Sequence, residues 1–238
     1  MADIQKKHWW YEGRRKILSS TIATLPLNDP TNTKILEIGC GTGANLNMLK
    51  KFGSVHGAEP HDFAREYAHK ISDCPIETAF LPHDIPFKGN FDLIGVFDVI
   101  EHVDEDLESL KAIHARLNDT GYAVFTVPAF QFLWSKHDEV NHHKRRYTKK
   151  QFHSLLKEAG YDVKLISYYN FWLFPLVAFI RAIKNITKSK AETGDVKLPK
   201  SSILNTLLCK IFSSENFLIK VKAPIPFGVS IIAVCQKI

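Results

Sequence analysis

The sequence predicts an α/β protein built on a doubly wound, mostly parallel, seven-stranded sheet. Short apolar runs typical of buried strands alternate along the chain with segments of helical periodicity, and a glycine-rich turn follows the first apolar run. Parallel strands joined through helices need right-handed crossovers, which place helices on both faces of the sheet. A long helical segment interrupts the alternation before the last strand.

The individual elements follow from local signals. We expect strands at residues 34–38, 54–58, 91–97, 122–127, 162–167 and 228–236, with a further strand before the loop at 78–82. We expect helices at residues 9–25, 44–52, 61–72, 104–117 and 148–159. Thr148 is a good N-cap for the last of these helices, and Gly160 is a good stop.

Length and composition favour one domain over residues 1–238. With 238 residues and 45% hydrophobic content, the chain can bury one sizeable core. Residues 1–27 read as an N-terminal helical cap, and residues 168–227 as a helical, partly apolar insertion. The formal charge of +6 favours anionic partners without identifying one. Four scattered cysteines form neither a disulfide framework nor a zinc-ligand pair, which favours a cytoplasmic location.

The apolar stretch at residues 171–180 is the most membrane-like part of the chain. It is about half the length needed to cross a bilayer, and Pro175 argues against one long straight helix. With the basic residues that follow, residues 171–190 suit a peripheral contact with an anionic membrane, at its inner face. A helical subdomain or a homodimer contact explains the same pattern. The polar segment at 188–200 reads as a flexible loop, and the charged N-terminus does not resemble a secretory signal.

The chemistry begins in the turn after the first strand, which reads E-x-G-x-G-x-G from Glu37 to Gly43. Its glycines let the backbone turn sharply and approach a ligand ahead of a helix N-terminus. Glu59 ends the second strand about twenty residues on, where a carboxylate can accept hydrogen bonds from ribose hydroxyls. The spacing fits neither the dinucleotide motif nor a Walker loop. Loop and acid together predict an adenosine-type site.

These motifs, with the segment from Phe97 to His102, resemble those of class I S-adenosylmethionine-dependent methyltransferases over roughly residues 34–127. The resemblance implies a Rossmann-like methyltransferase fold, S-adenosylmethionine as cofactor and S-adenosylhomocysteine as product. It implies that Glu37 orients the loop, that Glu59 holds the ribose, and that Asp98 flanks the methionine moiety. The full set of cofactor residues it implies is Glu37, Gly39, Cys40, Gly41, Gly43, Glu59, Pro60, Phe80, Leu81 and Asp98. Phe80 and Leu81 stand where relatives contact adenine, but the acid usual at that place is missing.

A narrower resemblance covers more of the chain. The segment from His8 to Arg15 and the motifs between Val127 and Thr148 are similar to those of a bacterial subgroup associated with surface-polysaccharide or lipid-linked glycan enzymes. This resemblance implies a small-molecule, sugar or lipid-linked acceptor. The aromatic N-terminal helix could act as a lid over the cofactor or pack in the core, and both readings stay open.

Residues 128–147 leave the carboxyl end of a central strand, the edge at which open α/β sheets bind ligands. We expect substrate contacts from Trp10, Arg14, His102, Asp138, Arg145, Arg146 and Tyr147. A sugar hydroxyl has a high pKa, so its methylation needs a base, for which His137 and His142 are the candidates. The alternative is that Arg145 to Tyr147 merely cap the next helix. No metal site is expected, because the His and Asp spacing here matches no firm signature.

The two resemblances together imply methyl transfer to a small-molecule, sugar or lipid-linked acceptor, at a hydroxyl oxygen. The basic charge is compatible with a nucleic-acid substrate, but the segment after residue 97 lacks the Pro-Pro-aromatic motif that holds a flipped base. Nucleic acid is therefore disfavoured. A protein substrate and a catalytically silent cofactor-binding module are the remaining alternatives.

Overall fold

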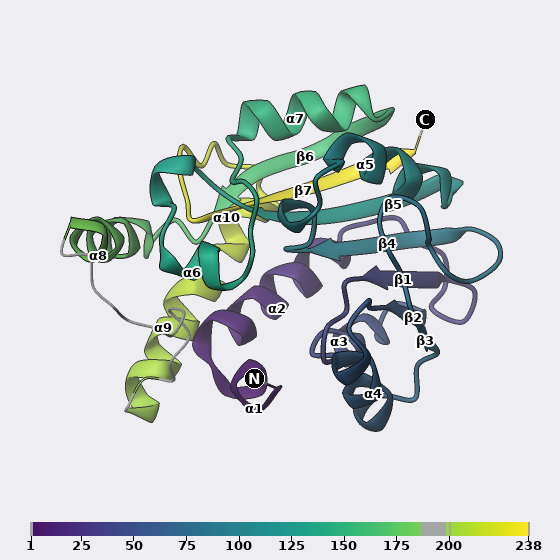
Figure 1. The fold of residues 1–238 in the computed structure, drawn as a ribbon, viewed down its shortest axis with the longest axis horizontal. Helices are drawn as coiled ribbons and strands as arrows, with labels where there is room; N and C mark the ends of the chain where they lie inside the picture. Colours follow the sequence, from purple (N-terminus) through teal and green to yellow (C-terminus); the bar gives the residue numbers. More distant parts are fainter. Residues whose placement is uncertain (1, 187–198, 200, 238) are drawn as a thin grey trace.

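A computed structural model describes residues 2–186, 199 and 201–237. Its centre is a seven-stranded sheet with the order β3-β2-β1-β4-β5-β7-β6 (Figure 1). The strands are β1 (Lys34–Ile38), β2 (Ser54–Ala58), β3 (Ile76–Glu77), β4 (Phe91–Phe97), β5 (Leu117–Pro128), β6 (Tyr161–Tyr169) and β7 (Ser230–Lys237). Only β7 runs antiparallel to its neighbours, β5 and β6. The predicted mostly parallel sheet is confirmed.

The helices cover both sides of this sheet. They are α1 (Ala2–Lys7), α2 (Trp9–Ile22), α3 (Leu46–Leu49), α4 (Asp62–Ile71), α5 (Asp106–Ala115), α6 (Lys136–Val140), α7 (Lys149–Glu158), α8 (Phe174–Ile186), α9 (Ser202–Ser214) and α10 (Asn216–Lys220). Two short 3-10 helices, η1 (Ile100–His102) and η2 (Gln131–Leu133), follow β4 and β5. In Figure 1, α5 and α7 lie above the sheet, and α2, α3 and α4 lie on its lower side.

Several boundaries differ from the prediction. Helix α1 was not expected, and the helix predicted at 9–25 ends at Ile22, after which the chain makes a turn. The helix predicted at 104–117 is also too long, because Leu117 already belongs to β5 and pairs with Phe91 of β4. A register shift between Phe91 and Leu93 accommodates this early pairing. Such a long-range pairing has no local sequence signal.

Helix α7 forms as its caps predict. The hydroxyl of Thr148 accepts from the backbone N–H of Gln151 at 3.2 Å, and the Gln151 side chain accepts from the backbone N–H of Thr148 at 2.9 Å. This reciprocal capping box satisfies two backbone donors that the first turn leaves unpaired. Gly160, with a φ of 94°, then ends the helix.

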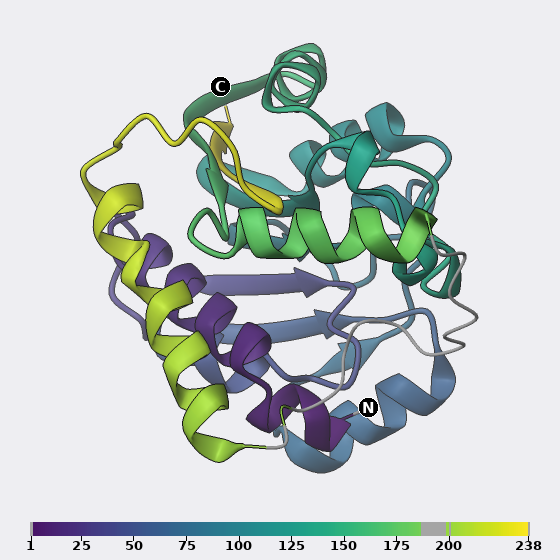
Figure 2. The same ribbon diagram turned by 90° about the vertical axis from the view of Figure 1, so that its left-hand side faces the viewer.

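Helix α2 is held against the sheet by its apolar face. Ile17, Leu18 and Ile22 are at most 1% exposed, which stabilises the fold by roughly 1.5–3 kcal/mol for each side chain. A Cβ atom on Gly13 would lie 2.5 Å from the ring of Phe212 in α9, so α2 and α9 need this glycine for their close approach. Figure 2 shows α9 running alongside α2. The insertion therefore returns to cover the N-terminal helix.

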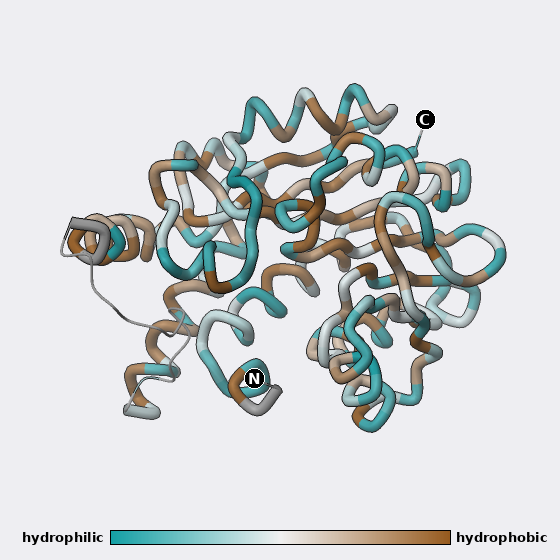
Figure 3. Tube along the Cα trace, in the orientation of Figure 1, coloured by the Kyte–Doolittle hydropathy of each residue, from teal (hydrophilic) through white to brown (hydrophobic). Residues whose placement is uncertain are grey.

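The insertion is helical, as predicted. Helix α8 begins at Phe174 with Pro175 in its first turn, where the missing N–H of proline is tolerated. Apolar residues recur along α8 and α9 (Figure 3). In the part of the chain that the structure describes, no helix is long and apolar enough to cross a lipid bilayer. The loop predicted at 188–200 lies outside the described residues, apart from Pro199.

Candidate active site

The carboxyl ends of β1, β4 and β5 border a cavity of about 580 Å³. Gly39 to Gly41 follow β1, Asp98 follows β4, and Pro128 ends β5. The arrows of β1 and β4 in Figure 1 point toward the side on which α6 and α8 lie. Further walls come from α1, α2, η1, α6, α8 and α9 and from the loops after α6 and β6. The cavity thus occupies the edge at which open α/β sheets bind ligands.

The glycine turn is shaped to leave room for a ligand. Gly39 and Gly41 have φ angles of 72° and 54°, in the left-handed region that favours glycine. Among the described residues, a Cβ atom on Gly41 would meet nothing within 4 Å. Cys40 lines the cavity between them, and burial raises the pKa of its thiol, which keeps it protonated. Gly43 instead packs against Ala68 of α4 and does not line the cavity.

Glu59 anchors this turn from the end of β2. One carboxylate oxygen accepts from the backbone N–H of Gly41 at 2.8 Å, and the other accepts from that of His61 at 3.0 Å. Two carboxylate oxygens offer about four lone-pair positions. Glu59 therefore keeps acceptor capacity for two hydroxyls of a ribose. Glu59 and Pro60 lie beside the cavity and do not line it.

Glu37 lies beneath the turn and is fully buried. Its carboxyl group accepts a hydrogen bond from the side-chain amide of Asn45 at 2.7 Å, which ties β1 to the start of α3. Burial raises the pKa of Glu37 to about 8, although the Asn45 hydrogen bond and the Arg14 charge act in the opposite direction. Glu37 therefore supports the loop from below and does not line the cavity.

The segment predicted to contact adenine forms a small, open loop. Phe80 and Asp84 exchange backbone hydrogen bonds of 2.9 and 2.8 Å, and the Leu81-Pro82 peptide bond is cis. The Phe80 side chain is 57% exposed. Neither Phe80 nor Leu81 lines the cavity. The cavity thus borders the glycine turn expected at the methionine end of the cofactor, while Phe80 and Leu81 lie outside it, Phe80 exposed and Leu81 half-buried.

Asp98 joins the sheet to the N-terminal helix. Its backbone has a φ of 58°, and the hydroxyl of Thr126 donates to its carboxylate at 3.1 Å. The same carboxylate forms an ion pair with Arg14 of α2. The Arg14 guanidinium lies 4.7 Å from the ring of Trp10, an attractive cation–π geometry. Asp98, Arg14 and Trp10 all line the cavity, so the sequence-predicted residues meet there.

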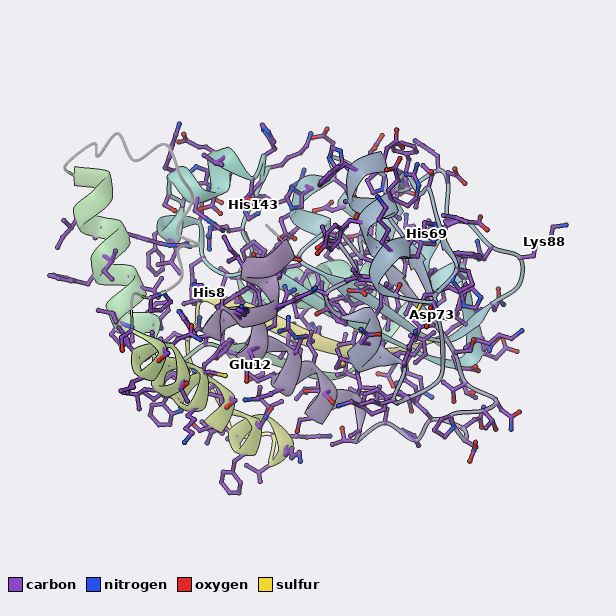
Figure 4. The ribbon with its side chains drawn as sticks, turned by 90° about the horizontal axis from the view of Figure 1, so that it is seen from below. His8, Glu12, His69, Asp73, Lys88 and His143 are labelled. Carbon is purple, nitrogen blue, oxygen red and sulfur yellow. The ribbon has the colours of Figure 1, made fainter. Side chains whose placement is uncertain are left out.

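Three of the histidines that line the cavity, His102, His137 and His143, lie close together in its wall. The rings of His102 and His143 meet edge to face with centroids 4.7 Å apart, and the centroids of His137 and His143 are 6.0 Å apart. Burial and the neighbouring His143 lower the pKa of His102. Figure 4 shows His143 and His8, both lining residues, toward the α8 and α9 side of the molecule. His142 has a φ of 56°, is exposed and does not line the cavity.

Asp138 is fully buried behind these histidines and organises them. It accepts from Nε and Nη2 of Arg146 at 2.8 and 3.0 Å and from Nδ1 of His143 at 2.8 Å. Burial opposes the ionisation of Asp138, but His143 and Arg146 outweigh it and hold the pKa of this carboxyl well below its usual range. Arg146 and His143 line the cavity, whereas Asp138 positions them from behind.

Arg145 and Tyr147 are directed elsewhere. A guanidinium nitrogen of Arg145 and the hydroxyl of Tyr147 both donate to the same carboxylate oxygen of Asp106, at 2.8 and 2.9 Å. Burial, together with the Asp106 carboxylate, raises the pKa of the Tyr147 hydroxyl. Neither residue lines the cavity. Their contacts fasten the segment before α7 onto α5.

Residues 9–165 match the family described as a methyltransferase domain. The chain belongs to this methyltransferase family. The match identifies the chain as an S-adenosylmethionine-dependent methyltransferase, and S-adenosylmethionine is therefore its cofactor.

Relatives of this methyltransferase are distant in sequence. A ubiquinone biosynthesis O-methyltransferase of Vibrio campbellii is 26% identical over 100 residues, which are 39% of this chain and 43% of that protein. The match thus spans less than half of the relative.

Solved structures resemble the methyltransferase over nearly its whole length. A complex between a Haloferax volcanii methyltransferase activator and a methyltransferase has a TM-score of 0.62 at 13% identity, with 99% of this chain and 92% of that chain covered. Magnesium protoporphyrin IX methyltransferase of Synechocystis, with bound S-adenosylhomocysteine, has a TM-score of 0.57 at 11% identity, with coverages of 95% and 84%. These likenesses show the fold.

Sequence reasoning did not select Glu101 or His143 of this methyltransferase as site residues, yet both line the cavity. Glu101 is 0% exposed, and among the described residues neither of its carboxylate oxygens has a hydrogen-bond partner. Burial and the Asp98 carboxylate raise its pKa well above the usual range. The sequence signal that could have identified Glu101 as a site residue is its position directly after the turn at Asp98. His143 carried no signal that separated it from His142.

Proposed function

We propose that this methyltransferase transfers the methyl group of S-adenosylmethionine to a hydroxyl oxygen of a sugar, small-molecule or lipid-linked acceptor. The observation that carries the proposal is the cavity, which joins the glycine turn and Asp98 to a wall of histidines and Arg146. The likeness to a ubiquinone biosynthesis O-methyltransferase supports oxygen as the methylated atom.

The cofactor takes the glycine end of the cavity in this proposal. Gly39, Cys40 and Gly41 border its methionine end, together with Asp98. Glu59 accepts from the ribose hydroxyls through its remaining lone pairs, and the backbone of Phe80 or Leu81 contacts the adenine. Glu37 supports the turn, Gly43 packs it against α4, and Pro60 continues the ribose wall. The left-handed turn and the space above Gly41 support this placement.

The acceptor takes the histidine end. Transfer from a sulfonium is an in-line displacement, so the enzyme mainly aligns the two reactants and excludes water. His137 lines the cavity and removes the hydroxyl proton as the oxygen attacks, while Arg146 orients an anionic or polar group of the acceptor. His142 is exposed and outside the cavity, so we carry His137 forward as the base.

An apolar wall supports an acceptor with a lipid portion. Leu173, Val177 and Ile180 line the cavity from α8 and the loop before it. Phe179 and Ile183, on the same helix, are 64% and 44% exposed. This continuity fits a peripheral membrane contact through residues 171–190 at the inner membrane face, and an acceptor drawn from lipid-linked glycan or surface-polysaccharide synthesis.

Arg181 is one of the basic residues that follow the apolar stretch, and it is not available for a membrane contact. It is 7% exposed and donates to the backbone carbonyl of Leu133 at 2.9 Å. Its guanidinium also lies 4.0 Å from Asp138. Residues 187–190 of the expected contact lie outside the described residues.

The test is a methyl-transfer screen with labelled S-adenosylmethionine against cell fractions separated into glycolipid, small-molecule, protein and nucleic-acid pools. We expect label in the glycolipid or small-molecule pool. Label confined to nucleic acid or protein would contradict the proposed acceptor class. With the labelled acceptor, H137Q should slow single-turnover transfer by about 10²-fold or more. H142Q is the matched control and should transfer at the wild-type rate.

A further inference from the structure

Three side chains of metal-ligand type meet in the cavity wall. Glu101 and His102 belong to η1, and His143 follows α6. One ligand atom from each lies within 4.8 Å of the others, and all three residues line the cavity. His143 stands some forty residues after Glu101 and His102 in the sequence. The three residues therefore form no short metal-binding motif that could be recognised from their spacing.

The surroundings of Glu101 suit a bound cation. Its carboxyl group is fully buried, and among the residues that the structure describes it accepts no hydrogen bond. Ionising a carboxyl group that is buried without a hydrogen-bond partner is costly, so Glu101 favours its neutral form. Arg146 and Arg14, the nearby cations, are engaged with Asp138 and Asp98. A positive ion beside Glu101 would offset this cost.

His143 is held in the orientation typical of a metal ligand. Its Nδ1 donates to the buried carboxylate of Asp138 at 2.8 Å, and Arg146 fixes that carboxylate with two further hydrogen bonds. A proton on Nδ1 leaves Nε2 with the lone pair that a metal ion needs. Metal-binding histidines commonly donate their other ring N–H to a carboxylate, which fixes the tautomer and the ring plane.

We propose that Glu101, His102 and His143 bind one divalent transition-metal ion in the wall of the cavity. Two imidazoles and one carboxylate suit zinc, cobalt, manganese or iron, and three protein ligands leave coordination positions open to the cavity. Ligand atoms at about 2.0–2.2 Å from one ion in tetrahedral geometry lie about 3.3–3.6 Å apart. The side chains therefore need to approach one another by roughly 1 Å to close around an ion.

The role of the ion rests on the proposed function. An acceptor hydroxyl bound at an open position would have a lower pKa, because the ion stabilises the developing alkoxide. The hydroxyl proton passes to His137, and an oxygen lone pair forms the new bond to the methyl carbon. The bond from that carbon to sulfur breaks, and its electron pair stays on sulfur, which leaves as the neutral thioether of S-adenosylhomocysteine.

The decisive experiment is a metal titration without cofactor or acceptor. The full-length protein is treated with a chelator, dialysed and titrated with Co²⁺, while binding is followed by calorimetry and by the visible absorption of the bound ion. We expect one Co²⁺ ion to bind per chain, with a visible absorption spectrum typical of Co²⁺ bound by imidazole ligands. E101Q, H102Q and H143Q should each weaken binding by about tenfold or more, whereas H142Q, next to the site but exposed, should bind as wild type.

Two results would overturn the proposal. One is the lack of stoichiometric binding by wild-type protein, and the other is binding that E101Q, H102Q and H143Q leave unchanged while thermal unfolding shows all three folded. Because the titration contains neither substrate, its outcome is independent of the methyl-transfer screen. Undiminished transfer by chelated wild-type enzyme would overturn the role of the ion in the reaction.

Discussion

Arg14 in α2 forms an ion pair with Asp98, which follows β4, so the N-terminal helix is attached directly to the edge of the sheet that borders the cavity. The Asp98 carboxylate is also held by Thr126 of β5. This one carboxylate therefore connects α2, β4 and β5 beside the glycine turn and fixes their positions relative to one another. The pair is therefore expected to affect both stability and cofactor binding.

Replacing Arg14 by alanine leaves the Asp98 charge without its partner. The Asp98 side chain is 21% exposed, so solvent screens part of the loss, and we expect destabilisation of about 1–3 kcal/mol with weaker binding of S-adenosylmethionine. Urea unfolding and calorimetry measure the two effects. K16A is the control, because Lys16 pairs with Glu12 on the exposed face of the same helix. Equal stability of R14A and K16A would contradict this expectation.

Alanine at Gly39 and at Gly41 should have different consequences. Both positions have positive φ, which costs roughly 1–2 kcal/mol for alanine. The new methyl group at Gly39 would lie 2.3 Å from a methyl carbon of Val99, so G39A should be strongly destabilised. G41A should fold, but its methyl group enters the proposed cofactor space and should weaken S-adenosylmethionine binding about tenfold or more. Wild-type affinity in G41A would refute the proposed cofactor position.

Glu37 should give the protein a characteristic pH dependence of stability. Burial raises its pKa from the ordinary 4.5 to about 8, so between these values the folded state holds a proton that the unfolded state releases. Its contribution to stability is complete below about pH 4.5 and is lost as the pH rises toward 8, with a total on the order of a few kcal/mol. E37Q keeps a neutral group there. Urea unfolding from about pH 5 to pH 8 should therefore show a flatter profile in E37Q than in wild type, and parallel profiles would exclude this role.

Truncations separate the lid and core roles of the N-terminal helices. Deletion of residues 1–7 removes Gln5, which lines the cavity and accepts from the Thr42 hydroxyl at 2.7 Å, but keeps the buried face of α2. We expect a folded protein that releases S-adenosylmethionine faster, measured by stopped-flow displacement. Deletion through residue 22 removes Ile17, Leu18 and Ile22 and should unfold the protein by circular dichroism. An unchanged release rate in the shorter deletion would argue against a lid.

Exposed apolar residues of α8 should mediate vesicle binding. Serine at both Phe179 and Ile183 removes large apolar groups that are 64% and 44% exposed. We expect the double variant to lose flotation with acidic vesicles while its thermal unfolding changes little. F63S is the control, because Phe63 is 80% exposed on α4, away from α8. If wild type fails to float, or if F63S lowers flotation equally, α8 is not the contact.

Local sequence determined most of the proposed cofactor side of the cavity. A strand, a glycine turn and a helix are adjacent in the chain, and glycine at positions 39 and 41 permits the left-handed angles that this turn adopts. Glu59 was predictable as well, because neighbouring parallel strands end at the same edge of the sheet, and its bond to Gly41 is the direct result. The fold class followed from the same alternation of elements.

Tertiary structure alone decided the proposed acceptor side of the cavity. The adjacent His142 and His143 are equivalent in sequence, but a left-handed backbone at His142 leaves it exposed while Asp138 draws His143 into the cavity wall. Asp106 likewise turns Arg145 away from the cavity that Arg146 lines. These orientations depend on hydrogen bonds between elements that are distant in the sequence and on which side chain is buried. Neither can be predicted from the spacing of residues along the chain.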